Sequence, residues 1–341
     1  MIQRKRGFAT ALALGLLCAS PAAAKIGDLL PKPHALTATG QTPFALQRAI
    51  RLTDPTGCTY LQNVLTAQGC TFDEGAAATV TVEIVESIPG AFNHNVNLFP
   101  DEAYTLEITT DAVRIQALTE TGVIRAAQTL QQLAEGYDGG SAALETLSMT
   151  DWPAFKVRGF MHDVGRSFLS IGELKREIDN LARFKVNVFH WHLTEKLAWR
   201  FEVKAYPQLT ESQNMIRYAG QYYTQDECRE LEAYAAERGV TIIPEIDMPG
   251  HSDVFTTAMG FNMQSDEGVA ALKVILDEVI DVFPKAPYIH IGGDEVTITY
   301  PNFLKTMADY VRGKGKKVVM WNQLKGGAPT AEQCDMTQMW A

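Results

Sequence analysis

The sequence of 341 residues has few basic residues, which limits what the protein can bind. Lysine and arginine number 30 against 40 aspartates and glutamates, so the formal net charge is -10 at pH 7. A nucleic-acid-binding protein presents a basic surface to phosphates, and no basic stripe offsets this acidic balance. We therefore expect no nucleic acid among the partners.

Cysteine is also scarce, with five residues in the whole chain. None of their spacings is that of a metal site. Cys58 and Cys70 are close in sequence and flanked by loop-like residues, so they form the expected disulfide if the protein is exported. Cys228 lies in a helical pattern and is predicted to be a buried thiol.

The N-terminal apolar run, from Ala9 to Leu17, is too short to span a membrane. It follows three basic residues at positions 4–6 and precedes an A-x-A sequence that ends at Ala24. This order is typical of a cleavable secretory signal. We predict that residues 1–24 are removed and that the protein is periplasmic or secreted, with no membrane anchor after cleavage.

The pattern from Lys25 to about Thr150 is mixed α/β. The segments "ATVTVEIV" and "AYTLEITTDAVRIQAL" alternate apolar and polar residues, as half-buried antiparallel strands do. A helical pattern follows them, and its apolar face consists of Val123, Ala127, Leu130 and Leu133. We predict that residues 25–150 form a small α/β domain in which a helix backs a sheet.

After "DWPAFK" short apolar strands alternate with amphipathic helices. The six strands are "VRGFMHDV", "VNVFHWHL", "VTIIPEID", "YIHIGGDE", "KVVMWN" and "TQMW". Apolar strands separated by helices are typical of a parallel sheet with both faces covered. A doubly wound sheet usually has a glycine-rich phosphate loop after its first strand, and "HDVGRSF" is not one. The sequence therefore favours a (β/α)8 TIM-type barrel for residues 151–341.

A closed (β/α)8 barrel has eight strands, and only six precede Ala341, so we expect the barrel to be incomplete. Catalytic residues of this fold lie at the carboxyl ends of the strands. Here the strands end in polar or aromatic residues, namely His162, Asp163, His190, His192, Glu245, Asp247, Asp294, Glu295, Trp321, Asn322 and Trp340.

Two adjacent carboxylates, Asp294 and Glu295, follow an apolar strand and two glycines. Alternation along the strand would point them in different directions, and the glycines would let another group approach the backbone closely. Buried carboxylates are costly unless they are bonded or their pKa shifts, and a carboxyl that stays protonated can act as a general acid. Such a pair is often only a helix N-cap, but at the end of a barrel strand it favours catalysis.

Histidines also lie at the carboxyl end of one other strand and in the turn after another. His190 and His192 share one face of their strand, and His251 follows a Pro-Gly turn that would present it to the barrel mouth. Together with Asp294 they could bind zinc, as H-x-H sequences do in some barrel hydrolases. The alternative is that the first two are hydrogen-bonded core histidines.

Two tryptophans, Trp321 and Trp340, end neighbouring strands. Elsewhere in a protein a strand tryptophan is usually part of the core. Beside carboxylates at a barrel mouth, however, tryptophans suit a sugar ring, which has apolar C–H faces and a rim of hydroxyls.

The motifs "RGFMHDVGRSF", "VNVFHWHLTE", "PEIDMPGHS", "HIGGDEV" and "MWN" together make the sequence similar to glycoside hydrolase family 20, the β-N-acetylhexosaminidases. The combination of "HIGGDE" with "PEIDMPGH" is specific. The resemblance runs from about Lys25 to the end, and implies a small α/β domain before the barrel. It implies retaining, substrate-assisted hydrolysis of terminal non-reducing N-acetyl-D-hexosamine residues, without a cofactor. Chitin fragments, peptidoglycan fragments or glycoconjugate ends would be the substrates.

The resemblance also implies roles for individual residues. Glu295 would protonate the leaving oxygen and later deprotonate the attacking water. Asp294 would bind the acetamido N–H and stabilise the oxazolinium intermediate. The implied substrate-binding residues are Arg158, which would bind sugar hydroxyls, His192, His251, and Trp321 and Trp340 as walls of the acetamido pocket.

Two positions depart from the family pattern, one of them His162, which replaces a more typical apolar residue. Lys196 stands where an aspartate is usual, beside Glu195, which is expected to weaken a carboxylate relay to His251. Two alternatives to the hexosaminidase hypothesis remain. The first is a zinc-dependent barrel hydrolase that uses His190, His192, His251 and Asp294. The second is a sugar-binding protein without catalytic activity.

Overall fold

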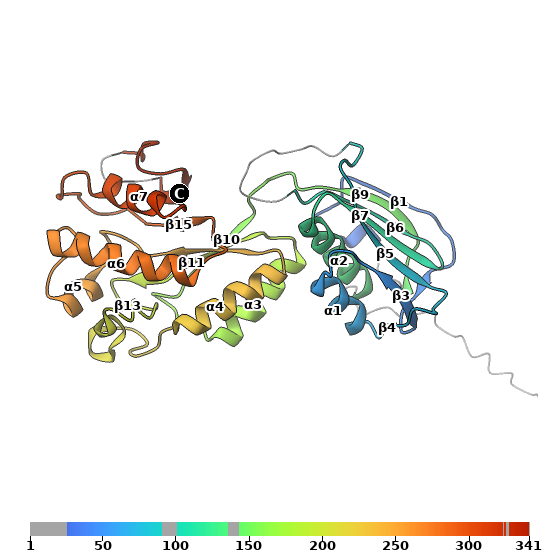
Figure 1. Ribbon diagram of the computed structural model, residues 1–341, viewed down its shortest axis with the longest axis horizontal. Coiled ribbons are helices and arrows are strands. Elements are labelled where there is room, and N and C mark those ends of the chain that lie inside the picture. Colours follow the sequence, from blue (N-terminus) through green and yellow to red (C-terminus); the bar gives the residue numbers. More distant parts are fainter. Residues whose placement is uncertain (1–25, 91–100, 136–142, 323, 325–326, 341) are drawn as a thin grey trace, which may run out of the picture.

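The computed structural model describes residues 26–90, 101–135, 143–322, 324 and 327–340, so the predicted signal at residues 1–24 lies outside it. Figure 1 shows two lobes joined side by side, an N-terminal lobe in blue to green and a C-terminal lobe in green to red. Among the described residues, no helix has both the length and the apolar character needed to cross a membrane.

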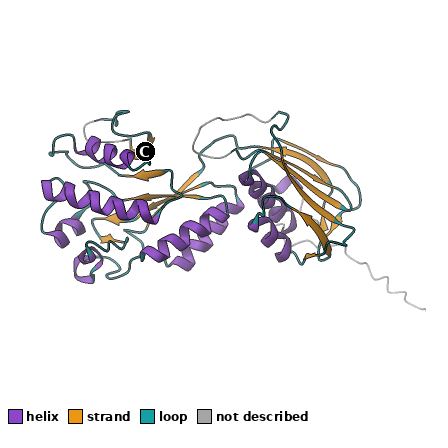
Figure 2. Cartoon of the chain, viewed as in Figure 1, coloured by secondary structure: helices purple, strands orange, loops and turns teal. Residues whose placement is uncertain are grey.

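The N-terminal lobe is a twisted sheet with two helices on one face (Figure 2). Its helices are η1 (Ile26–Asp28), α1 (Thr59–Ala67) and α2 (Glu120–Glu135). Its strands are β1 (Ala35–Ala38), β2 (Phe44–Ala45), β3 (Ala49–Thr53), β4 (Thr71–Phe72), β5 (Thr79–Ile84), β6 (Tyr104–Ile108), β7 (Ala112–Ala117), β8 (Ala143–Leu144) and β9 (Leu147–Asp151).

Seven of these strands form one sheet in the order β1-β9-β6-β7-β5-β3-β4. The predicted alternating strands are present as β5, β6 and β7, and the predicted helix is α2, whose four apolar face residues are all buried. Only β6 and β7 pair as the expected antiparallel hairpin, whereas β5 pairs parallel to both β7 and β3. Alternation reveals that one face of a strand is buried, but it does not reveal the direction of its neighbours.

The predicted disulfide between Cys58 and Cys70 is wrong, because both are free, buried thiols, as are Cys228 and Cys334. Cys58 caps the start of α1 and Cys70 follows its end. A helix of nine residues is about 14 Å long, at 1.5 Å per residue, which is more than twice the usual Cα separation in a disulfide. The prediction of a buried thiol at Cys228 is confirmed.

The C-terminal lobe is built on a six-stranded parallel sheet with the order β10-β11-β14-β15-β16-β17. These strands are β10 (Gly159–Asp163), β11 (Val188–His192), β14 (Thr241–Glu245), β15 (Tyr288–His290), β16 (Lys317–Trp321) and β17 (Met336–Gln338). Its other elements are α3 (Ile171–Arg183), α4 (Gln225–Glu237), α5 (Asp253–Met259), α6 (Asp266–Val282), α7 (Phe303–Gly313), η2 (Pro207–Thr210), η3 (Ser212–Asn214) and the short hairpin of β12 (Thr194–Glu195) and β13 (Ala198–Trp199).

All six predicted barrel strands are present, and their spatial order follows the chain. A doubly wound sheet would reverse its order at a switch point, so this order is that of a barrel wall. Capping boxes start two of its helices, with Ser170 and Glu173 at α3 and Thr224 and Glu227 at α4. The strands run nearly parallel, so their carboxyl ends lie along one edge of the sheet.

Helix α2 lies between the two lobes, against the amino ends of the barrel strands (Figure 1). Its apolar face packs on the N-terminal sheet, but Arg125, Gln128 and Gln132 on its other side are buried as well. They donate to backbone carbonyls of Gly239, Arg238 and Arg183 in the barrel lobe. This explains why a helix with so many polar residues is buried almost all round.

Candidate active site

The turn after β15 requires its two glycines. Gly292 has φ +65°, and a Cβ there would lie 1.7 Å from Oδ1 of Asp247. Gly293 has φ +102°, and its Cβ would lie 2.7 Å from Cε of Met320. The groups that approach this backbone closely are therefore side chains of the neighbouring strand ends. Their packing fixes the path of the chain into Asp294 and Glu295.

Asp294 and Glu295 lie in different environments, as strand alternation predicted. Asp294 is buried, and its Oδ1 has no hydrogen-bond partner among the described residues. Burial, together with the nearby charge of Glu245, raises the pKa of Asp294 above its ordinary value. The side chain of Glu295 is 57% exposed, and its backbone has φ 56°. A left-handed conformation in a non-glycine residue is typical of strained functional sites.

His251 lies between the carboxylates and is also left-handed, with φ 49°. Its Nε2 is 3.4 Å from Oε2 of Glu295 and 3.9 Å from Oδ1 of Asp294. Its Nδ1 is 2.7 Å from Oε1 of Glu195. The hydrogen bond to Glu195 raises the pKa of His251 to about 9, against the opposing effect of burial. His251 is therefore a cation at neutral pH.

Glu195 is the carboxylate that orients His251, although Lys196 replaces the usual acid. The side chain of Glu195 is fully buried and also accepts from Arg166 and from the backbone N–H of Lys196. The hydrogen bond with His251 and its charge, followed by Arg166 and the Lys196 N–H, hold the pKa of Glu195 below its ordinary value, in spite of burial. Glu195 therefore contacts His251 in spite of the lysine beside it.

Arg166 is a residue of the site that the sequence interpretation missed. It follows β10, and its guanidinium donates to Asp163 at 2.5 Å and to Glu195. Its side chain is 46% exposed, so it reaches the surface beside the carboxylates. The signal was present in "HDVGRSF", because Arg166 directly follows the carboxyl end of a barrel strand.

Arg158 is not part of this cluster. It precedes β10, so it lies at the amino end of the strand, and a strand of five residues separates it from Asp163 by about 16 Å. Its guanidinium donates to Glu102, to the carbonyl of Lys185 and to the carbonyl of Phe155. The prediction that Arg158 binds sugar hydroxyls at this site is corrected, and Arg166 is the arginine at the right end of the strand.

A buried layer of hydrogen bonds and one further close ionic contact, between His290 and Glu245, forms the floor below the carboxylates. Glu245 contacts three imidazoles: His190 through Nε2 at 2.8 Å, His290 through Nδ1 at 2.9 Å, and His192 through Nδ1. Burial raises the pKa of Glu245, but the charges of the histidines outweigh it and hold the pKa well below its ordinary value. His190 and His192 share one face as predicted, while Trp191 packs on the opposite side in the helix-facing core.

His192 is therefore a floor residue, only 3% exposed, and not a side chain at the open mouth. Asp247 lies in the same layer, where it accepts from the N–H of Gly293 at 3.3 Å. Burial and the charges of Glu245 and Asp294 raise the pKa of Asp247 well above its ordinary value.

The two tryptophans occupy neighbouring strand ends. Trp321 ends β16, is 6% exposed, and packs its ring 4.7 Å from that of His290. Trp340 follows β17, is 39% exposed, and donates its backbone N–H to Oδ1 of Asn322 at 3.1 Å. Trp321 thus adds an aromatic side to the floor, and Trp340 lies further out beside it.

Three groups of side chains place metal-ligand atoms within 4.8 Å of one another in the described chain: His190, Glu245 and His290; His192, Glu245 and Asp247; and Asp247, His251 and Asp294. The zinc hypothesis needs His190, His192, His251 and Asp294 in one set. Those four are divided among the three groups, with His190 and His192 directed at Glu245 and His251 directed at Glu195. The zinc ligand set is therefore not assembled as predicted.

The chain matches known proteins over most of its length. Residues 27–152 match the family model "Glycosyl hydrolase family 20, domain 2", and residues 155–302 match "Glycosyl hydrolase family 20, catalytic domain". The chain is 30% identical to a beta-N-acetylhexosaminidase of Cellulomonas fimi, over 92% of this chain and 68% of that protein. It is 36% identical to a beta-hexosaminidase of Vibrio furnissii, over 57% of this chain and 37% of that protein.

A solved structure agrees with these matches. The GH20 exo beta-N-acetylglucosaminidase from Vibrio harveyi, in complex with N-acetylglucosamine, superposes with a TM-score of 0.75 and 25% identity, over 94% of this chain and 58% of that one. The chain spans 68% of the Cellulomonas fimi protein. It spans less than two thirds of the other two, namely 37% of the Vibrio furnissii protein and 58% of the Vibrio harveyi structure.

Proposed function

Because this chain belongs to glycosyl hydrolase family 20, we propose that the protein hydrolyses β-N-acetylhexosaminides at a terminal non-reducing N-acetyl-D-hexosamine. The observation that carries the proposal is the cluster in which the imidazole of His251 lies between Glu195 and the Asp294–Glu295 pair. The predicted family and the TIM-type fold are confirmed, and the activity of the whole protein is the proposal.

The reaction uses a nucleophile from the substrate. The acetamido oxygen attacks the anomeric carbon, and the bond from that carbon to the leaving oxygen breaks as Glu295 gives that oxygen a proton. Water then opens the resulting oxazolinium ring and returns a proton to Glu295. Two attacks on one carbon leave the anomeric configuration unchanged. Glu295 is the more exposed of the two carboxylates, which suits a group that exchanges protons with the leaving group and with water.

Asp294 is placed to act on the acetamido group. Its unpartnered Oδ1 lies in a buried position where a substrate N–H would satisfy it, and a carboxylate there stabilises the positive charge of the oxazolinium. His251 holds a proton 3.4 Å from Glu295, so it can exchange that proton with the acid/base during turnover. Arg166 supplies a guanidinium for sugar hydroxyls, and Trp321 and Trp340 supply apolar surface for the ring.

The test uses the full-length protein and p-nitrophenyl N-acetyl-β-D-glucosaminide. A thiazoline analogue of the cyclised intermediate should inhibit it competitively, and Asp294→Asn should lower kcat and weaken that inhibitor together. Asp111→Asn, an exposed residue of the N-terminal lobe, is the matched control and should change neither. Equal inhibition of the wild type and Asp294→Asn would overturn the substrate-assisted mechanism. Activity lost on chelation and restored by zinc would instead favour a metal hydrolase.

Export is part of the same proposal. The basic start, the short apolar run and the A-x-A sequence at the N-terminus support cleavage after Ala24 and release of the mature protein from the cytoplasm. Sequencing the N-terminus of the mature protein tests this. A first residue of Lys25 is the expected result, and a retained Met1 would overturn it.

A further inference from the structure

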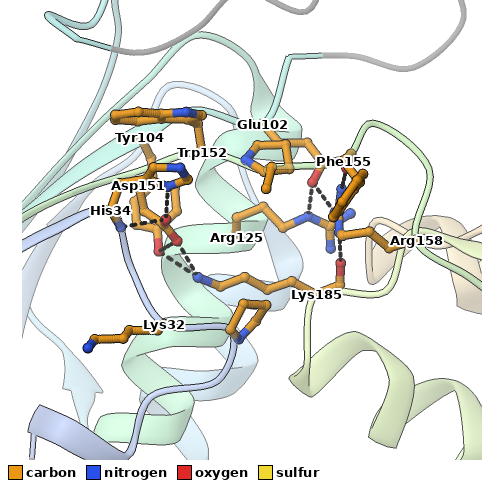
Figure 3. A pocket seen from close by; sticks show the side chains of 13 residues that line it. Lys32, His34, Glu102, Tyr104, Arg125, Asp151, Trp152, Phe155, Arg158 and Lys185 are labelled. Carbon is orange, nitrogen blue, oxygen red and sulfur yellow. Dashed lines mark hydrogen bonds and ion pairs between the residues drawn. The ribbon is translucent and has the colours of Figure 1, made fainter.

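A cavity of about 260 Å³ lies between the two lobes. It is at the amino ends of the barrel strands, whereas Asp294 and Glu295 are at the carboxyl ends. Its walls come from the segment before β1, from the ends of β6 and β9, and from the residues just before β10 and β11. Figure 3 shows it, with Trp152 and His34 at one end, Phe155 and Arg158 at the other, and the side chain of Lys185 extending between the two ends. Its volume is close to the lower end of the range for ligand pockets, about 300–1,000 Å³.

The cavity is positively charged in a strongly acidic chain. Lys32, Arg125, Arg158 and Lys185 line it, against only two carboxylates. Both carboxylates are already paired. Glu102 accepts from Arg125 and Arg158, and Asp151 accepts from Lys185 at 2.8 Å. The remaining charge is therefore cationic.

Two of the cations keep N–H groups without a protein acceptor among the described residues. The ammonium of Lys185 has three, and only two are used, toward Oη of Tyr104 and Oδ2 of Asp151, each at 2.8 Å. The guanidinium of Arg158 has five, and three are used. Lys185 is 7% exposed, so its free N–H is held inside the cavity wall and is not displayed to bulk solvent.

Two aromatic side chains, Trp152 and Phe155, also line the cavity. The ring of Trp152 is fixed by stacking on His34 at 3.9 Å. Phe155 is 74% exposed, although it is a large apolar residue, and it lines the cavity next to Arg158, across from the ring of Trp152 (Figure 3). Exposed aromatic side chains beside a cavity are unusual in a folded protein unless something covers them. A rigid ring face and an exposed ring together suit a flat or cyclic ligand.

We propose that this cavity binds a small cyclic carboxylate, of about the size of a monosaccharide, with its carboxylate on Lys185 and Arg158 and its ring against Trp152 and Phe155. A planar guanidinium matches a carboxylate in shape as well as charge. Sugar acids and aromatic acids share this chemistry. Because the two cations belong to the barrel lobe and Trp152 follows the last strand of the N-terminal lobe, the ligand would also tie the lobes together.

The experiment titrates full-length protein with four probes by calorimetry and records the melting temperature. Glucuronate and benzoate represent the two sources of a cyclic carboxylate. Glucose has the ring without the charge, and inorganic phosphate has the charge without the ring. At least one carboxylate should bind saturably and raise the melting temperature, while glucose and phosphate bind at least about tenfold more weakly. No saturable binding, or equal binding of phosphate, would overturn the proposal.

Two variants locate the binding. Phe155→Ala removes an exposed ring and leaves the charges, so it should weaken binding about 2- to 10-fold, the usual contribution of an aromatic contact. Phe72→Ala, also an exposed phenylalanine but in β4, is its matched control. Lys185→Met should weaken binding about 10- to 100-fold, as loss of a charged hydrogen bond does. Unchanged affinity in Phe155→Ala would overturn the proposal even if Lys185→Met fails to fold.

Discussion

The two edges of the barrel sheet carry similar residue types and arrange them differently. At the amino edge the buried carboxylate of Glu102 lies between Arg125, Arg158 and the side-chain amide of Asn187. At the carboxyl edge the buried carboxylate of Asp294 has one oxygen without a hydrogen bond and a histidine 3.9 Å away. Both oxygens of the carboxylate accept hydrogen bonds at the first edge, whereas one oxygen is left without a partner among the described residues at the second.

This difference separates stability from chemistry. A buried carboxylate such as Glu102, whose two oxygens both accept hydrogen bonds from the protein, holds the lobes together. A buried carboxylate that lacks a partner reduces the stability of the empty protein and leaves a position that a ligand N–H can satisfy. The division agrees with the general property of (β/α)8 barrels that catalysis lies at the carboxyl ends of the strands.

The largest expected effect is on turnover at the carboxyl edge. Glu295→Gln removes the proposed acid/base and should lower hydrolysis of an unactivated disaccharide by about two to four orders of magnitude. The loss should be smaller in the first step for substrates with very good leaving groups. The exposed Glu267→Gln is the control and should retain full turnover. Near-wild-type hydrolysis by Glu295→Gln would remove Glu295 from this role.

The next effect is on stability at the amino edge. Glu102→Gln leaves Arg125 and Arg158 with an uncharged partner, and breaking a buried ion pair costs about 3–5 kcal/mol. Urea unfolding should show this loss, while turnover per folded molecule is unchanged. Glu107→Gln breaks an exposed pair with Arg114 and should cost less than about 1 kcal/mol. Equal losses in the two variants would mean that the Glu102 ion pairs do not stabilise the contact between the lobes.

A third change tests how tightly the catalytic turn is packed. Gly292→Ala places a methyl group 1.7 Å from Oδ1 of Asp247, and overpacking of this kind costs about 1–3 kcal/mol. It should also displace Asp294 and lower kcat. Gly315→Ala has a similar φ of +81° with nothing within 4 Å of the added carbon, so it measures the backbone strain alone. If both variants behave alike, contact with Asp247 is not what requires the glycine.

The smallest effect is a shift in pH dependence. Glu195→Gln removes the main cause of the raised pKa of His251, so that pKa should fall from about 9 toward its ordinary value. His251 is charged below its pKa, and its contribution to stability and activity is lost as pH rises through that value. The alkaline limb of kcat/KM should therefore move down by about one pH unit or more. Glu177→Gln, which alters the similar pair with His162, should leave the limb in place, and an unmoved limb in Glu195→Gln would contradict the relay.

The sequence predicted the barrel strands well, because strand ends with polar residues repeat six times and the pattern is local. It also placed Asp294, Glu295 and His251 at the barrel mouth, since all three lie in the segments that follow the carboxyl ends of β14 and β15. It placed Arg158 wrongly because "VRGF" starts a strand, whereas "VGRSF" follows one. The distinction between the two arginines depends on where β10 begins and ends, and boundaries are the least certain part of a pattern.

Other features depend on contacts distant in sequence. The three histidines around Glu245 come from two other strands, 45 to 55 residues away from it, and no local pattern connects them. The sequence suggested a disulfide between Cys58 and Cys70 from proximity alone, and the helix between them prevents it. The cationic cavity between the lobes was not predicted, because its residues are spread from Pro31 to Lys185.

Helix α2 has a consequence for synthesis. Its buried Arg125 and Gln128 donate to the carbonyls of Gly239 and Arg238, which follow them by 114 and 110 residues. At about 5–20 residues per second, a ribosome adds those carbonyls roughly 6–23 seconds after the helix itself. During that interval the N-terminal lobe can form its sheet, but Arg125 and Gln128 of α2 lack the carbonyl acceptors that the barrel lobe later provides. The first lobe made is therefore completed by the second, and a pause in translation before Gly239 would leave an arginine and a glutamine of α2 open to other partners.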